Sequence, residues 1–539
     1  MGIFKVPVPK NEPFYSYAPG SRERTQLKDA IETLKNQQID IPMIIGGKHV
    51  KTADKVKITA PHDHSLVLGQ YYRGGKGEVE AAVKAALDAR PAWEKMSWAD
   101  RASIFLKAAD LLAGKYRNEM NAATMLAHDK NIFQAEIDCV CELVDFFRFN
   151  VHFAEQIMAV QPDNQPTIWN RMDYRPLEGF VFAVTPFNFV SIAGNLPSSP
   201  AIMGNTVVWK PASSVVYTAN LIMEVFHEAG LPDGVINMIT ARGADVGEII
   251  LKHRDLAGIH FTGSTATFQS MWKIVGENIK NYKNYPRIVG ETGGKDFVFV
   301  HPSADPASVV TAITRGAFEY QGQKCSAASR AYIPKSLWPT ISEGLCGDAR
   351  EMKMGPPDDF GNFVNAVIDE EAFKSITAYV DYAKNSKEAQ VIFGGKYDGS
   401  KGWFIEPTLV VTTNPHFKLM EEEIFGPVMT AFVYDDAKYE ETLKLCDQTS
   451  PYALTGSIFA REKAAIIRAM EVLRFAAGNF YINDKPTGAV VGQQPFGGGR
   501  ASGTNDKAGS LLNLIRWTSP RAIKENFSPP TDFKYPFMG

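Results

Sequence analysis

The chain has 539 residues and nearly balanced charges, with 57 Lys and Arg against 60 Asp and Glu, so its formal net charge is −3. This balance argues against a nucleic-acid surface or a polybasic membrane surface, and 45% hydrophobic residues describe a packed globule. Its five cysteines are scattered without a CxxC pair, which excludes a disulfide framework and a zinc site, so we expect no metal.

The N-terminal third is predicted to be mostly helical after an extended lead-in. Apolar side chains recur at helical spacing over residues 27–34, and strand-like stretches follow at 42–50 and 55–60. Residues 78–157 have the pattern of several amphipathic helices, the last of them continuous over about 133–158. The longest apolar run, 179–194, is too short and too polar to span a bilayer, so we expect no membrane segment.

Two series of short apolar strands alternating with helices follow. The first series comprises residues 180–184, 206–209, 235–239 and 258–261. The second comprises residues 297–300, 331–333, 390–393, 428–433, 456–459 and 478–482. Such alternation predicts parallel sheets covered on both faces, hence an α/β protein with two doubly wound parallel-sheet domains joined by a hinge near 287–295.

Two outlying segments are predicted to be strands without a local sheet. Residues 167–174 alternate like a half-exposed strand, and strand-like pieces from about residue 511 end in a tail rich in proline and aromatic residues. An isolated strand pair is not stable alone in water, so these segments are expected to need a partner surface.

Polar and glycine residues stand where strands of the first series end. Thr185, Pro186, Phe187 and Asn188 follow one strand, Lys210 another, and the turn at 263–265 opens a helix. Ligands of open parallel sheets bind beyond these strand ends, and a helix N-terminus presents free N–H groups to a phosphate. The usual GxGxxG fingerprint of dinucleotide sites is absent.

A cysteine and a carboxylate form the candidate reactive pair. Cys325 stands among small residues after Lys324, a cation that would favour the thiolate, although a cysteine in this setting is more often inert. Glu291, flanked by glycines at the junction of the two series, fits a general base or else a hinge carboxylate paired with Lys295. The amide of Asn188 would stabilise an oxyanion beside the sulfur.

Six ordered motifs together resemble the aldehyde dehydrogenase superfamily. They are Pro186-Phe187-Asn188, Lys210-Pro211, Phe261–Thr265, Glu291–Lys295, Gly322–Cys325 and Glu423–Pro427. The stretches 492–506 and 514–520 resemble the branch that oxidises glutamate-γ-semialdehyde, the open form of Δ1-pyrroline-5-carboxylate, in its animal mitochondrial form.

The resemblance implies NAD-dependent oxidation of this semialdehyde to glutamate through a cysteine thiohemiacetal and thioester. Cys325 would attack the aldehyde, Asn188 would hold the oxyanion, and Glu291 would activate the water. The implied cofactor residues are Thr185, Pro186, Phe187, Lys210, Gly263, Ser264, Thr265, Ala266, Thr267, Glu423 and Phe425. The implied substrate residues are Phe189, Ser326, Gly488, Ala489 and Phe496.

Two positions depart from the pattern of the branch. Ala489 stands where the branch typically has Ser, so a side-chain hydrogen bond to the substrate is lost while the backbone N–H remains. Phe268 stands where many members have Gly in the helix-opening turn, which predicts a tighter helix start. Ser213 and Ser214 are compatible with a 2′-phosphate, so only the resemblance favours NAD over NADP.

The resemblance also implies the organisation and setting of the protein. The expected cofactor domain comprises 1–161 and 181–290 and the catalytic domain 291–492, while 162–180 and 505–539 form an oligomerisation arm and tail. A homodimer in the mitochondrial matrix is implied, with any presequence already removed. The alternatives are a dehydrogenase of another small semialdehyde, a cofactor-free thiol esterase and a non-catalytic, crystallin-like structural protein.

Overall fold

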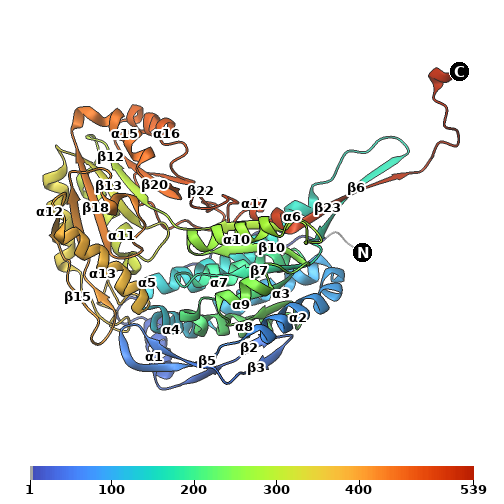
Figure 1. Cartoon of the computed structure of the whole chain (residues 1–539), viewed down its shortest axis with the longest axis horizontal. Helices are drawn as coiled ribbons and strands as arrows, with labels where there is room; N and C mark the ends of the chain where they lie inside the picture. Colours follow the sequence, from blue (N-terminus) through green and yellow to red (C-terminus); the bar gives the residue numbers. More distant parts are fainter. Residues whose placement is uncertain (1–3) are drawn as a thin grey trace.

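The computed structural model describes residues 4–539, which form two seven-stranded sheets side by side with a projecting two-stranded arm (Figure 1). No helix in this described part is long and apolar enough to cross a bilayer. The α/β class with two doubly wound sheets is confirmed, and both sheets also carry an antiparallel edge that the strand–helix alternation did not reveal.

The first sheet has the strand order β11-β10-β7-β8-β9-β2-β3. Its parallel strands are β7 (Phe180–Val184), β8 (Thr206–Lys210), β9 (Ile236–Met238), β10 (Leu256–Thr262) and β11 (Arg287–Glu291). The strands β2 (Met43–Ile45) and β3 (Lys48–Val50) form the antiparallel edge.

Alternate residues of β7 enter two separate cores, which is why this sheet is covered on both faces. Phe180 and Phe182 pack with α2 (Lys76–Lys95), α9 (Gly243–Ile249) and α10 (Thr265–Glu277). Val181 and Ala183 pack on the opposite face, because successive side chains of a strand point to opposite sides. The helices of that face are α3 (Trp98–Ala113), α4 (Arg117–His128), α6 (Leu143–Ala159), α7 (Val190–Ile202) and α8 (Val216–Ala229).

The predicted continuous helix at 133–158 is interrupted. It consists of α5 (Ile132–Ala135), a π-helical stretch at Glu136–Glu142, and α6. Such π-helical stretches occur often at functional sites.

The first helix, α1 (Arg22–Lys35), buries the side chains of Leu27, Ile31 and Leu34, as their spacing predicted.

The second sheet has the strand order β14-β17-β18-β13-β12-β20-β21. Its strands are β12 (Asp296–Val300), β13 (Ala328–Pro334), β14 (Ala389–Phe393), β17 (Thr408–Thr412), β18 (Val428–Tyr434), β20 (Thr455–Phe459) and β21 (Asn479–Ile482). Its helices are α11 (Pro306–Phe318), α12 (Trp338–Glu351), α13 (Glu370–Asn385), α15 (Tyr439–Gln448) and α16 (Lys463–Val472). Strand β17 was not predicted, and β14 pairs antiparallel to it.

The smaller elements complete the molecule. They are a three-stranded sheet of β1 (Ile39–Ile41), β5 (Asp63–Tyr72) and β4 (Lys55–Ala60), the pairs β15 (Tyr397–Asp398) with β16 (Phe404–Ile405) and β19 (Tyr452–Ala453) with β22 (Gly499–Arg500), and the short helices α14 (Lys418–Glu421) and α17 (Leu511–Leu514).

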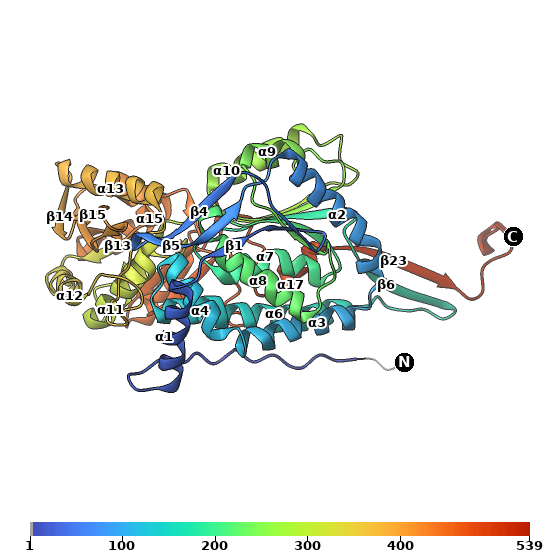
Figure 2. The same ribbon diagram turned by 90° about the horizontal axis from the view of Figure 1, so that it is seen from below.

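The arm is formed by β6 (Ile168–Pro176) and β23 (Thr518–Asn526), which pair antiparallel along their whole length. Both views show it extending away from the body, with the C-terminal segment beyond it (Figures 1 and 2). The two outlying strand predictions therefore meet in one ribbon, which pairs with no other strand among residues 4–539.

Candidate active site

The chain passes from the first sheet to the second at residues 292–295, and this crossing brings Glu291 toward Cys325. A Cβ atom on Gly294 would lie 2.2 Å from the carbonyl oxygen of Cys325, and one on Gly293 would lie 2.2 Å from Glu423. Gly294 therefore requires glycine, because a side chain there would collide with the backbone of Cys325, whereas a side chain at position 293 would have to displace the carboxylate of Glu423. Gly294 lets the Glu291 loop pack directly against the cysteine segment.

The cysteine segment is a strained turn after α11. Tyr320 and Gln321 have φ values of 51° and 55°, in the left-handed region that non-glycine residues rarely adopt. The Gln321 amide holds the turn by donating to the backbone oxygens of Asp129 and Ala366 at 2.9 and 2.8 Å. Because hydrogen bonds to neighbouring segments hold this strained turn, the backbone of the residues that follow it, including Cys325, is fixed in place.

Burial, and then the negative charge of Glu291, raise the pKa of the Cys325 thiol well above its ordinary value. Lys324 does not offset this, because its ammonium pairs with the buried Glu319 at 3.1 Å. The expectation that Lys324 would favour the thiolate is therefore not supported. The thiol needs a base to take its proton when it attacks.

Asn188 follows β7 and points toward the cysteine segment. Its side-chain Nδ2 donates to the carbonyl oxygen of Gln323 at 3.1 Å, two residues before Cys325. Asn188 is buried, and it does not line the cavity described next. Its amide is fixed beside the cysteine segment by this bond.

A cavity of about 450 Å³ lies against the sulfur. Its wall contains Cys325, Glu291 and the predicted substrate residues Phe189, Ser326, Gly488, Ala489 and Phe496.

The pKa of Glu291 is raised to about 8, mainly by burial; the charge of Asp506 adds to this shift and that of Lys507 opposes it. Lys295, the alternative partner of Glu291, instead donates to the Ser329 hydroxyl at 2.6 Å.

One wall of the cavity offers backbone donors. Gly488 has φ +95°, which turns the chain so that the N–H groups of Gly488 and Ala489 find no acceptor within residues 4–539. The hydroxyl of Ser326 lies 2.8 Å from that of Thr487, beside the same turn. Free N–H groups next to a hydroxyl form a suitable receptor for a carboxylate.

The predicted cofactor residues of the first domain lie at the carboxyl ends of its strands. Ser264 caps α10 by accepting from the Thr267 N–H at 3.3 Å, which leaves the N–H groups of Thr265 and Ala266 without a partner in the helix. Lys210 ends β8, and its ammonium has no hydrogen-bond or carboxylate partner in the described chain; burial lowers its pKa. The hydroxyl of Thr185 accepts from Trp209 at 2.9 Å.

Two predicted cofactor residues of the second domain, Glu423 and Phe425, lie near those of the first. Phe425 has φ 57° and meets Phe187 edge to face, with 5.6 Å between the ring centroids. Glu423 accepts from the Gly294 N–H at 2.8 Å, and burial raises its pKa to about 7. The two groups of predicted cofactor residues are thus brought together between the sheets.

The sequence profile of the aldehyde dehydrogenase family matches residues 49–522. The chain belongs to the aldehyde dehydrogenase family. It is 53% identical to the mitochondrial delta-1-pyrroline-5-carboxylate dehydrogenase of Dictyostelium discoideum, over 99% of this chain and 96% of that protein. It is 46% identical to the mitochondrial enzyme of that name from Homo sapiens, over 98% of this chain and 94% of that one.

One solved structure is similar to the present chain over its full length. The delta-pyrroline-5-carboxylate dehydrogenase of Mycobacterium tuberculosis, bound with NAD, superposes with a TM-score of 0.97 and 51% sequence identity. The comparison covers 100% of this chain and 99% of that one.

Phe268, the departure in the helix-opening turn, is accommodated by a glycine. Its ring stacks on Phe261 at 5.3 Å and occupies the space where a Cβ of Gly290 would lie only 2.2 Å from it. The first turn of α10 is regular and capped. The larger residue therefore packs inward and leaves the N-terminus of the helix open.

Several residues of the site were missed from the sequence. Glu142 lines the cavity, and burial followed by the charge of Asp138 raises its pKa to about 8. Thr487 lines the substrate wall, and Tyr452 accepts from the hydroxyl of Thr265, a predicted cofactor residue, at 3.4 Å. No local motif marks these residues, since each reaches the site through tertiary packing.

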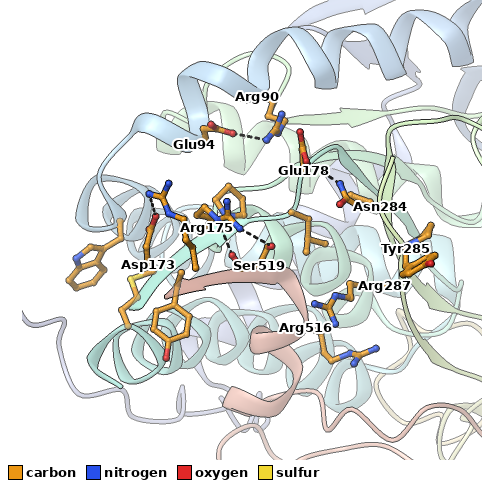
Figure 3. Close-up of a pocket in the computed structure, with 18 of the residues that line it drawn as sticks. Arg90, Glu94, Asp173, Arg175, Glu178, Asn284, Tyr285, Arg287, Arg516 and Ser519 are labelled. Atoms are coloured by element: carbon orange, nitrogen blue, oxygen red, sulfur yellow. Dashed lines mark hydrogen bonds and ion pairs between the residues drawn. The ribbon is translucent and has the colours of Figure 1, made fainter. Parts of the chain in front are cut away.

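A larger groove of about 1180 Å³ lies at the base of the arm (Figure 3). None of the predicted site residues lines it, and its polar groups largely pair with one another: Arg90 with Glu94 at 3.0 Å and Asn284 with Glu178 at 3.2 Å. Size alone would favour this groove, but the reactive residues lie in the smaller cavity.

Proposed function

We infer that this protein is an NAD-dependent aldehyde dehydrogenase that oxidises L-glutamate-γ-semialdehyde, formed from Δ1-pyrroline-5-carboxylate, to L-glutamate in proline degradation. The observation that carries the inference is the cavity wall that places Cys325 and Glu291 beside the free N–H groups of Gly488 and Ala489. Such a cavity can receive an aldehyde at the sulfur and a carboxylate at the wall of Gly488 and Ala489. The relatives from Dictyostelium discoideum and Mycobacterium tuberculosis are named as dehydrogenases of pyrroline-5-carboxylate.

The predicted cofactor residues of the two domains fit NAD. The open first turn of α10 suits a pyrophosphate, and the unpartnered Lys210 suits ribose hydroxyls. Phe187 and Phe425 with Glu423 would hold the nicotinamide riboside near the sulfur. When bound, NAD accepts the hydride that leaves the substrate carbon.

We propose that the sulfur of Cys325 adds to the aldehyde carbon while Glu291 takes the thiol proton. The second Nδ2–H of Asn188, the one not bonded to Gln323, and the backbone N–H of Cys325 would stabilise the oxyanion of the thiohemiacetal. Loss of hydride from that carbon leaves a thioester on Cys325. Glu291 passes the thiol proton to solvent before hydrolysis begins. It then takes a proton from a water molecule whose oxygen attacks the thioester carbon; the acid is released, and the proton passes from Glu291 to the departing sulfur, which restores the thiol.

The cavity would bind the amino-acid end of the substrate through hydrogen-bond donors for its carboxylate and a carboxylate for its ammonium. Ser326, Gly488 and Ala489 would donate to the substrate carboxylate, and the rings of Phe189 and Phe496 would enclose its aliphatic chain. Glu142 has no basic partner within residues 4–539, and its carboxylate is suited to the substrate ammonium. The ammonium would in turn favour ionisation of Glu142.

We further propose a homodimer that uses the arm, with the domain limits 1–161 and 181–290, 291–492, and 162–180 with 505–539. The arm supports this because it projects from the body and exposes Trp169 (47%) and Phe527 (63%). Relatives named as mitochondrial support a location in the mitochondrial matrix.

The test is NADH formation by the purified protein with Δ1-pyrroline-5-carboxylate, beside succinate semialdehyde and simple aldehydes. We expect the highest kcat/KM with the amino-acid semialdehyde. A higher value for a semialdehyde without the ammonium would favour the alternative substrate. No NADH with any aldehyde would favour the structural-protein alternative.

A further inference from the structure

The N-terminus of α7, which carries Asn188 and Phe189 just before it, is capped from outside its own segment. Its N-cap residue Phe189 makes no side-chain hydrogen bond to the helix. Instead, the carboxylate of Asp138, from the π-helical stretch, accepts from the N–H groups of Val190 and Ser191 at 3.0 and 2.9 Å. A carboxylate at a helix N-terminus satisfies free donors and complements the helix dipole.

Asp138 is held by a buried ammonium. Lys130 Nζ lies 2.6 Å from Asp138 Oδ2, and both side chains are at most 1% exposed. The hydroxyl of Ser191 donates to Asp138 at 2.7 Å and lies 3.1 Å from Glu142. This network therefore reaches two groups of the proposed substrate site, Phe189 and Glu142.

Lys130 also contacts aromatic rings from two different segments. Its Nζ lies 4.4 Å from the ring centroid of Phe189 and 4.4 Å from that of Tyr320. Tyr320 belongs to the strained turn that leads to Cys325. A desolvated ammonium between two rings attracts both, so Lys130 ties the aromatic wall of the cavity to the cysteine segment.

We propose that Lys130 and Asp138 are positioning residues that set substrate specificity. They hold the ring of Phe189 at the place where the aliphatic chain of the amino-acid semialdehyde passes. Asn188 keeps its own bond to Gln323, so the oxyanion donor depends less on this pair. The inference rests on the proposed function, because it concerns discrimination between aldehydes.

Lys130→Met removes the cation and keeps the volume of the side chain. We expect the ratio of kcat/KM for glutamate-γ-semialdehyde to that for acetaldehyde to fall about tenfold, mainly through a higher KM for the semialdehyde. Acetaldehyde has only a methyl group beyond its carbonyl, so it depends little on Phe189. A loss of folded enzyme alone would lower both values equally.

Lys130→Met/Asp138→Asn avoids leaving an uncompensated buried charge and is expected to lower the ratio similarly. Lys130→Arg keeps a cation for the carboxylate and the rings, and should stay within about threefold of the parent ratio. The matched control is Arg101→Met, because Arg101 is a buried cation that binds the Ile202 carbonyl at the other end of α7, at 3.3 Å.

Arg101→Met should lower Tm without changing the ratio. An unchanged ratio in Lys130→Met and in the double variant would overturn the proposal, as would an equal change in Arg101→Met. A parent enzyme that forms no NADH from the semialdehyde would overturn the proposed function instead, so the two failures are distinguishable.

Discussion

The half-buried carboxyl of Glu291 should make the protein less stable as the pH rises. Its pKa is raised from the ordinary 4.5 to about 8, so the folded state holds a proton that the unfolded state releases. Stability is therefore lost between pH 4.5 and 8 and stays constant above. The full shift corresponds to about 5 kcal/mol, and water in the cavity screens part of it, so we expect about 2–4 kcal/mol.

Glu291→Gln removes this titration while keeping the shape of the side chain. Thermal unfolding of the variant and the parent at pH 4.5, 7 and 9 should show no difference in Tm at pH 4.5 and a Tm higher by about 5 °C in the variant at pH 9. The same variant should lose thioester hydrolysis. In the parent, hydrolysis should increase with pH up to about 8, since only about a tenth of Glu291 is ionised at pH 7. A Tm difference that is independent of pH would show that titration of Glu291 does not cause the loss of stability.

Three further substitutions test separate parts of the site. Asn188→Ala should lower kcat by about 10²–10³ and change KM for the aldehyde little; a rise in KM alone would place Asn188 outside the oxyanion site. Ala489→Ser adds a hydroxyl beside the free N–H groups and should lower KM for the semialdehyde about tenfold, and an unchanged KM would argue against a carboxylate at this wall. Lys210→Met should raise KM for NAD about tenfold while kcat at saturation is retained, and unchanged NAD kinetics would contradict a ribose contact.

The candidate site could be predicted where its residues belong to short motifs at the ends of strands. Gly294 is required by close backbone approach, and Ser264 caps a helix by a local hydrogen bond, so each leaves a mark within a few residues. Glu142 and Lys130 leave no such mark, because Glu142 meets Ser191, and Lys130 meets the rings of Phe189 and Tyr320, from segments far away in the chain. The sequence likewise could not show that Lys324 turns to Glu319 rather than to the sulfur.

The fold, like the site, could be predicted where local sequence determines it and not where distant contacts do. The buried strands that alternate with helices were predicted, whereas β17 was missed, since Thr408–Thr412 is a five-residue run that follows a proline and is bounded by threonines. The antiparallel direction of β14 depends on its partner rather than on its own residues. The π-helical stretch at Glu136–Glu142 keeps helical periodicity closely enough that the apolar pattern predicted one continuous helix.

The most direct test of the central claim is NADH formation from Δ1-pyrroline-5-carboxylate by the parent and by Cys325→Ala. We expect steady NADH formation by the parent and none by the variant, because the thioester forms on this sulfur. Equal turnover in the variant would contradict it. So would a parent that oxidises simple aldehydes well and leaves the semialdehyde untouched.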